Sequence, residues 1–159
     1  MADYQQNKSL VLEYFDALEG CSADAVGAVL GRFASDDCEF LGSYPFNEMR
    51  GPAAITAGFW QPLFNAFQSL QRRQDIFIAG SSEIDGDQWV MSMGHFMGLF
   101  DDDWLGIRAT RKMVMPPSGG NMCAQRAPVN SGWRRRNFAL TLSEGAFANE
   151  NAQPKLVRR

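Results

Sequence analysis

The stretch Trp89–Ile107, which reads WVMSMGHFMGLFDDDWLGI, decides how this chain is expected to fold. Its first part alternates between two faces, as an extended strand of about 12 residues does. One face carries Trp89, Met91, Met93, His95, Met97 and Leu99, and the other carries Val90, Ser92, Gly94, Phe96, Gly98 and Phe100. Because Gly94 and Gly98 permit a bulge or a bend, this long strand is expected to curve.

His95 is the only histidine of the chain, and it shares its face with large apolar side chains. An imidazole has an ordinary pKa of about 6.5, so it can give or take a proton near neutral pH. On the concave wall of a bent sheet, His95 is a candidate catalytic acid or base, or a hydrogen-bond donor to a bound small molecule. The alternative is a hydrogen-bonded core histidine without a chemical role.

Several other large side chains are candidates for lining the same pocket. They are Tyr44, Trp60, Phe64, Met91, Met93, Met97 and Trp104. For each of them, ordinary core packing is the alternative. Two acidic features are expected to be solvated, namely Asp75 near the start of a strand and the triplet Asp101–Asp103, because no ordered set of oxygen ligands surrounds the triplet.

The rest of the first 110 residues predicts helices followed by a hairpin. Apolar spacing predicts a helix over about residues 3–19, a second helix capped by Ser22, and a third that opens at Gly51-Pro52. Pro62 lies inside the third helix and should kink or divide it.

A short strand over 38–42 precedes the third helix, and two antiparallel strands over 73–80 and 89–100 should turn at Asp85-Gly86-Asp87. This order predicts the α+β class, with N-terminal helices packed on a curved antiparallel sheet. Such a sheet forms a cone with an internal pocket suited to an apolar small-molecule ligand or substrate.

Composition excludes several classes of protein. The 159 residues are 45% hydrophobic and 12% aromatic, which is not the composition of a disordered chain. No secretory signal is expected, and no apolar run approaches the roughly 20 residues that span a bilayer. Cys21, Cys38 and Cys123 form no C-x-x-C pair, so they are interpreted as free thiols of a cytoplasmic protein without a metal site. No cofactor motif occurs, so no cofactor is expected.

The charge balance changes sharply near residue 110. Residues 1–110 carry 16 acidic and 6 basic side chains, whereas residues 111–159 carry 2 acidic and 9 basic ones. The second segment also holds four of the seven prolines and shows no sustained helical or strand period. The triplet Arg134–Arg136 could contact phosphates, but it lacks interleaved aromatic residues, so nucleic-acid binding is not expected.

Four segments in order resemble the SnoaL-like polyketide cyclases, also called predicted ester cyclases, of the nuclear-transport-factor-2-like superfamily. These segments are GPAAITAGFWQPLFNAF (51–67), QRRQDIFIAG (71–80), WVMSMGHFMGLFDDDWLGI (89–107) and ATRKM (109–113). The resemblance covers about residues 3–113. The most specific part is G-H-x-x-G-x-F followed by W-L-G-I and the T-R-K turn.

The resemblance implies a fold and a function. The family fold is a cone of helices on a curved antiparallel sheet, and its members commonly form homodimers through the outer sheet face, where Phe96 and Phe100 are expected. The best-understood members close a ring on a polyketide ester by cofactor-free acid–base catalysis, and the residue matching His95 lies in their pocket. The resemblance therefore implies a cyclase or isomerase acting on a polyketide-like or ester substrate. The alternative is a non-catalytic ligand-binding or assembly domain of the same fold.

The chain departs from the family after Met113, which divides it into an expected cone over 1–113 with an incomplete sheet and an atypical basic tail over 114–159. Relatives continue with a strand resembling L-R-x-A-E and then two further stretches of sheet, and their catalytic acid lies on a late strand of the sheet. Skipping one base at Pro116 lets the codons encode a similar strand, so a shifted reading frame and an impaired product form a further hypothesis. The nucleotide sequence of codons 113–118 would test it. The tail is expected to be poorly ordered and to add no strand.

Overall fold

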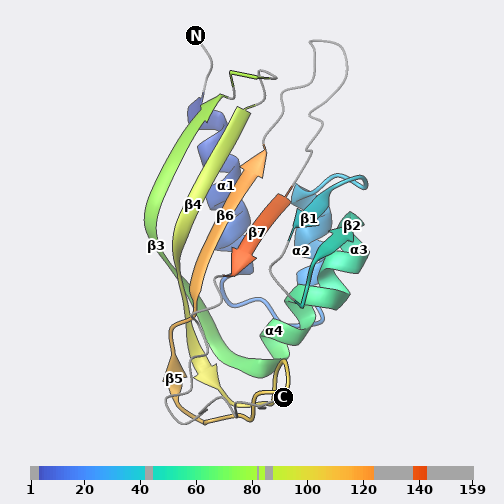
Figure 1. Cartoon of the computed structure of the whole chain (residues 1–159), viewed down its shortest axis with the longest axis vertical. Coiled ribbons are helices and arrows are strands. Elements are labelled where there is room, and N and C mark those ends of the chain that lie inside the picture. The colour runs from blue at the N-terminus through green and yellow to red at the C-terminus, as the bar shows by residue number, and fades with distance from the viewer. Residues whose placement is uncertain (1–3, 42–44, 82, 85–87, 124–137, 143–159) are drawn as a thin grey trace, which may run out of the picture.

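The structure of the chain is a computed structural model (Figure 1). It describes the backbone of residues 4–41, 45–81, 83–84, 88–123 and 138–142. Side chains are described for these residues up to residue 116, with the exception of Leu41. Tyr44, the turn at 85–87 and the triplet at 134–136 therefore lie outside the described residues. Within the described part, no helix is both long and apolar enough to cross a membrane.

The architecture is α+β, as the sequence predicts. The helices are α1 (Tyr4–Leu18), α2 (Val26–Phe33), α3 (Gly51–Ile55), the π-helix η1 (Thr56–Trp60) and α4 (Gln61–Ala66). The strands are β1 (Glu39–Leu41), β2 (Glu48–Arg50), β3 (Phe67–Ser81), β4 (Gln88–Phe100), β5 (Met113–Val114), β6 (Pro117–Cys123) and β7 (Phe138–Leu142). The large antiparallel sheet has the order β3-β4-β6-β7 with β5 also paired to β4, and β1 and β2 form a small sheet. Figure 1 shows α1 behind the large sheet, with β1 beside β7.

The third predicted helix is divided at Pro62, as expected. Proline has no N–H, so its nitrogen cannot bond to the carbonyl four residues earlier, and its ring crowds that carbonyl. The chain responds with the wider π-turn of η1, which ends at Trp60, immediately before α4 begins. Phe59 and Trp60 of this turn are fully buried, so the irregular turn directs two large rings into the core.

The predicted hairpin of β3 and β4 is antiparallel, with paired positions from Phe67↔Phe100 to Ser81↔Gln88. The register shifts twice along β3, between Gln68 and Gln71 and between Gln74 and Ile76. Each shift is a bulge that inserts an unpaired residue and reverses which later side chains face the helices. β3 begins earlier than the predicted residue 73 because the backbone of residues 67–72 pairs with β4.

The structure corrects the assignment of the two faces of β4. The buried face carries Val90, Ser92, Gly94, Phe96, Gly98 and Phe100, whereas His95 and the methionines lie on the face that the helices leave uncovered. Phe96 and Phe100, expected on the outer face, are buried against Trp60 and Phe67. The glycines explain the error, because a Cβ at Gly94 would lie 1.9 Å from the Arg73 carbonyl oxygen. The inner face of the bend is crowded and therefore carries glycines. In the sequence this face has fewer large apolar side chains, so it was wrongly assigned to the outside.

The segment after Pro116 contributes strands, contrary to the expectation that it adds none. β6 pairs with β4 from Trp89↔Cys123 to His95↔Pro117, and β7 pairs with β6. The free edge of β4 presents backbone donors and acceptors that need partners, and such pairing does not require an apolar period in the added strand.

The crowding at Gly94 generates a stability prediction. Gly94→Ala should lower the free energy of unfolding by about 2 kcal/mol or more, because the added methyl group would overlap backbone atoms that cannot rotate away. Gly80→Ala is the matched control, since a Cβ at Gly80 in β3 meets no atom within 4 Å. Urea unfolding followed by circular dichroism measures both variants. Equal stabilities of the two would contradict the close approach of β3 and β4.

Candidate functional site

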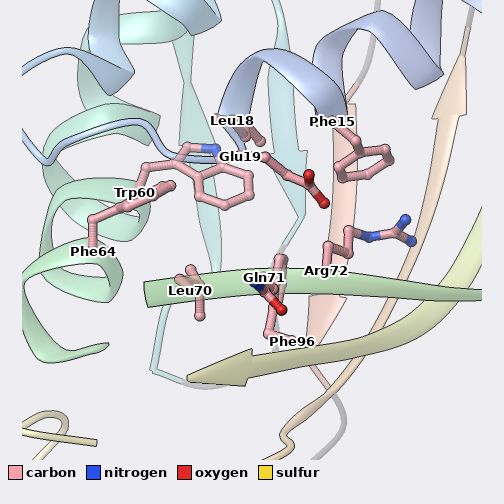
Figure 2. A pocket seen from close by; sticks show the side chains of 9 residues that line it. All are labelled: Phe15, Leu18, Glu19, Trp60, Phe64, Leu70, Gln71, Arg72 and Phe96. Atoms are coloured by element: carbon pink, nitrogen blue, oxygen red, sulfur yellow. The ribbon is translucent and has the colours of Figure 1, made fainter. Parts of the chain in front are cut away.

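A small cavity lies between the C-terminal end of α1, the π-turn and the first half of β3, and Figure 2 shows its wall. The lining residues are Phe15, Leu18, Glu19, Trp60, Phe64, Leu70, Gln71, Arg72 and Phe96. The space open to the centre of a water-sized molecule is about 10 Å³, so as it stands the cavity holds about one water. Most of the wall is aromatic or aliphatic, and its polar groups are those of Glu19, Gln71 and Arg72 and the indole N–H of Trp60.

Trp60 forms the centre of the apolar wall. Its ring meets Phe96 edge to face with 6.1 Å between ring centres, and it also contacts Phe64 at 6.1 Å. Tyr14 lies behind Trp60 at 6.3 Å. Burial raises the pKa of the Tyr14 phenol well above its usual value, which the nearby Cys38 thiol reinforces and the Trp60 side chain opposes. Tyr14 is therefore a neutral phenol at physiological pH.

Arg72 places a positive charge on this apolar wall. Its Nη2 donates a hydrogen bond to the buried Ser92 Oγ at 2.7 Å, and its guanidinium carbon lies 3.8 Å from the centre of the Phe15 ring. Burial lowers the pKa of Arg72 to about 10, opposed by the Asp75 carboxylate, so the side chain stays charged at neutral pH. Its buried Nε has no hydrogen-bond acceptor among the described residues. A desolvated donor of this kind favours an anionic or carbonyl oxygen as a partner.

Glu19 and Gln71 stand at the mouth of the cavity, and both are exposed to solvent. In Figure 2 the Glu19 carboxylate lies on the same side of the cavity as Phe15 and Arg72. Glu19 is the only carboxylate among the described lining residues. No salt bridge joins it to Arg72 in the described part of the chain.

A larger groove adjoins the cavity. It has a volume of about 680 Å³ and runs between the α1–α2 connection and the start of β3. Its lining residues are Gly20, Cys21, Ser22, Ala23, Asp24, Phe64, Asn65, Phe67, Gln68, Ser69, Leu70 and Gln71. Phe64, Leu70 and Gln71 line both spaces, so the groove and the cavity are neighbours that share a wall.

His95 lies on the opposite face of the sheet, where it has a partner that the sequence could not identify. Its Nδ1 lies 2.8 Å from Asp75 Oδ2, and Arg73 Nε donates to Asp75 Oδ1 at 3.0 Å. The His95 side chain is 40% exposed and that of Asp75 34%. The bulge between Gln74 and Ile76 turns Asp75 toward His95, so Asp75 is more than the solvated strand end expected from the sequence.

The structure separates the predicted pocket residues into three groups. Trp60 and Phe64, which the sequence places in a pocket, line the small cavity. His95 and the three methionines lie on the uncovered face of β4, so their placement in a cavity under the helices is wrong. Trp104 is buried but packs against Phe67 and Phe46, and neither of these residues lines the small cavity. Tyr44 lies outside the described residues.

Sequence reasoning missed the part of the wall that carries the charge. Phe96 occupies the position that was expected for His95, because the buried face of β4 is the one with the glycines. Arg72 was missed because the register shift at Asp75 breaks the alternation. Leu70 and Arg72 face the helices, whereas Ile76 and Ile78 of the same even-numbered series face outward.

Comparison with solved structures identifies the fold. No protein-family model and no curated protein matches the sequence. A protein described as a SnoaL-like polyketide cyclase from Jannaschia sp. CCS1 superposes with a TM-score of 0.64 at 20% identity, covering 86% of this chain and 84% of that one. AclR from Streptomyces galilaeus, described as a hydroxylase, superposes with a TM-score of 0.65 at 14% identity, covering 89% of this chain and 92% of that one.

A nuclear-transport-factor-2-like protein from Salmonella enterica serovar Typhimurium LT2 gives a TM-score of 0.59 at 13% identity, covering 93% of this chain and 96% of that one. These similarities extend beyond residue 113, since each covers more than four fifths of the chain. At such low identity they establish the fold and leave the chemistry to the residues of the site. The chain therefore has the fold of the SnoaL-like polyketide cyclases, within the nuclear-transport-factor-2-like architecture.

Proposed function

We propose that this chain binds a small, mainly apolar molecule that carries one carboxylate or carbonyl oxygen. The observation that supports this function is Arg72, a charged and desolvated side chain on an otherwise aromatic wall. Placing a guanidinium in such surroundings costs free energy unless its donors are satisfied, and the Nε donor has no described acceptor. A ligand oxygen would supply the missing acceptor, while the ligand's apolar body would contact Trp60 and Phe96.

The size of the two spaces supports a ligand that occupies both. The cavity beside Arg72 admits a single polar group, whereas the adjoining groove of about 680 Å³ falls in the range of ordinary ligand pockets. The shared residues Phe64, Leu70 and Gln71 would lie beside the middle of such a ligand. Gln71 and Glu19 are exposed at the mouth, and their movement would widen the opening without disturbing the core.

A cofactor-free cyclase or isomerase is the second candidate function, and the descriptions of the similar structures favour it. Acid–base catalysis on a polyketide-like or ester substrate would need a proton-transfer group beside the carbonyl that Arg72 holds. Glu19 is the carboxylate available on the described wall, and it is exposed at the mouth. His95 would face away from this substrate. The geometry therefore supports binding more strongly than catalysis.

We also infer that the chain forms a homodimer through the outer sheet face, with contacts other than Phe96 and Phe100, which are buried. Ile76 and Ile78 project from this face and are 46% and 53% exposed. Adjacent apolar side chains on an open sheet face favour association.

The charge on Arg72 predicts a preference for anionic ligands. Naphthoate should bind at least about 10-fold more tightly than naphthamide, because a hydrogen bond to a charged group contributes about 1.5–3 kcal/mol. Arg72→Met should remove this preference and leave the naphthamide affinity little changed. The neighbouring Arg73→Met is the matched control, since Arg73 lies on the other face and is paired with Asp75. Isothermal titration calorimetry measures the affinity of the wild-type chain and of both variants for naphthoate and for naphthamide. A preference that survives in Arg72→Met would refute the assigned ligand class.

Proton exchange distinguishes binding from catalysis. We expect no acceleration of deuterium exchange at the α-carbon of an aryl β-keto ester in D₂O, followed by proton NMR, because no buried base lines the described wall. Acceleration of about 10²-fold or more would instead establish the cyclase or isomerase function. In that case Glu19→Gln should abolish it and Glu13→Gln, on the exposed side of α1, should not.

The outer-face dimer is tested by analytical ultracentrifugation. Wild-type chain should sediment as a dimer at micromolar concentration, and Ile78→Glu should sediment as a monomer because a carboxylate would have to be buried in the interface. Ile84→Glu should remain dimeric, since Ile84 is 97% exposed and lies outside the strands. A monomeric wild-type chain would disprove this association.

A further inference from the structure

We propose that the molecule bound beside Arg72 is an α-amino acid with a large aromatic side chain. Arg72 holds its carboxylate, and Glu19 holds its ammonium group. This assignment rests on the proposed binding function and deepens it, because it gives a partner to the second charged residue of the cavity wall. An aromatic carboxylate without an amino group is the competing class of ligand.

The cavity wall carries two opposite charges. Among the lining residues that the structure describes, Arg72 alone is cationic and Glu19 alone is a carboxylate. Figure 2 shows both charged groups on one side of the cavity, whereas Trp60, Phe64 and Leu70 form the other side. A head group with one negative and one positive charge complements the first side, and an aromatic body complements the second.

The small size of the cavity favours a ligand whose two charges are close together. The cavity holds about one water, so the groups that line it surround a space no larger than a head group. In an α-amino acid, the carboxylate and the ammonium group are bonded to the same carbon atom. An amino group at the far end of an aromatic body would instead lie in the groove, which Glu19 does not line.

Arg72 has a donor left for the ligand carboxylate. Ser92 Oγ accepts a hydrogen bond from Nη2 at 2.7 Å, whereas the buried Nε has no acceptor among the described residues. A hydrogen bond between a guanidinium and a carboxylate is charge-assisted and therefore stronger than one between neutral groups. The carboxylate is thus the part of the ligand that enters the cavity.

Glu19 occupies a position that does not favour a carboxylate. It follows Leu18, the last residue of α1, and the unpaired carbonyl groups at a helix C-terminus create a negative potential. The last turn of α1 has no basic residue, and in the described part of the chain no salt bridge pairs Glu19 with a cation. Asp24 of the groove differs, because it precedes α2, where the helix N-terminus favours an acid. A ligand ammonium group would be attracted both by Glu19 and by the end of α1.

The residues shared by the two spaces accommodate the aromatic side chain of the ligand. Phe64 and Leu70 line both the cavity and the groove of about 680 Å³, so a side chain that passes between the two spaces contacts them. Trp60 and Phe96 offer further aromatic contact on the cavity wall. The groove has room for a side chain of two fused rings.

The test compares naphthylalanine with naphthylpropionate, which lacks only the amino group, by isothermal titration calorimetry of the full-length chain at neutral pH. The wild-type chain should bind naphthylalanine about 3–5-fold more tightly, the gain expected of an ion pair with an exposed carboxylate. In Glu19→Gln the order should reverse, because the ammonium group would lose water without gaining a partner. Asp16→Asn is the matched control and should keep the wild-type preference, since Asp16 is an exposed acid in the last turn of α1 that lines neither space.

The two probes also separate the amino-acid assignment from the binding function on which it rests. If the wild-type chain binds neither probe, the proposed binding function fails. If it binds naphthylpropionate, but naphthylalanine no more tightly, the amino-acid assignment alone is overturned. Naphthylpropionate should bind more tightly to Glu19→Gln than to the wild-type chain, because the repulsion between two carboxylates is removed, and such binding also shows that the variant is folded.

The chirality of the ligand supplies a second readout. Arg72, Glu19 and the apolar wall would hold the three different groups around the α-carbon, and contacts to all three distinguish one enantiomer from the other. The two enantiomers of naphthylalanine should therefore bind the wild-type chain with different affinities, and this difference should shrink in Glu19→Gln. Equal affinities of the enantiomers for the wild-type chain would overturn the assignment, as would an unchanged preference for naphthylalanine in Glu19→Gln.

Discussion

The close approach of β3 to β4 at Gly94 is the constraint on which the rest of the structure depends. A side chain at Gly94 would meet the carbonyl oxygen of Arg73 at 1.9 Å, so the two strands can bend this sharply only where β4 has no Cβ. The register shift at Asp75 occurs beside this contact. Together they decide that Phe96 and Arg72 face the helices and that His95 and Ile76 face outward.

The interior that results combines a dense aromatic core with one desolvated charge. Phe59 and Trp60 are fully buried, and the π-turn before Pro62 is what directs both rings inward. Arg72 enters the edge of this core, where Phe15 stacks on it and Ser92 accepts one hydrogen bond. The guanidinium keeps its charge at neutral pH but has fewer partners than it has donors, and this imbalance is the strongest indication of a ligand.

The two faces of β4 therefore offer different chemistry. The inner face presents Phe96 beside Arg72 of the neighbouring strand β3, and this combination suits an apolar molecule with an oxygen group. The outer face presents methionine side chains and an imidazole that contacts Asp75. Because successive side chains of a strand point in opposite directions, one short segment from Met93 to Met97 contributes to both surfaces without either disturbing the other.

The sequence by itself determined the main N-terminal helices, the division of the third helix at Pro62, the antiparallel pairing of β3 with β4 and the α+β class. Each of these follows from local periods or from the missing N–H of proline. Only the tertiary structure decided which face of β4 is inside, because both faces of that strand are apolar. It also placed the bulges of β3, each of which reverses the alternation of that strand. Likewise, it alone paired His95 with Asp75, 20 positions apart, and gave the segment after Pro116 a place in the sheet. Contacts between distant residues and backbone pairing at a free edge leave no periodic signal in the sequence.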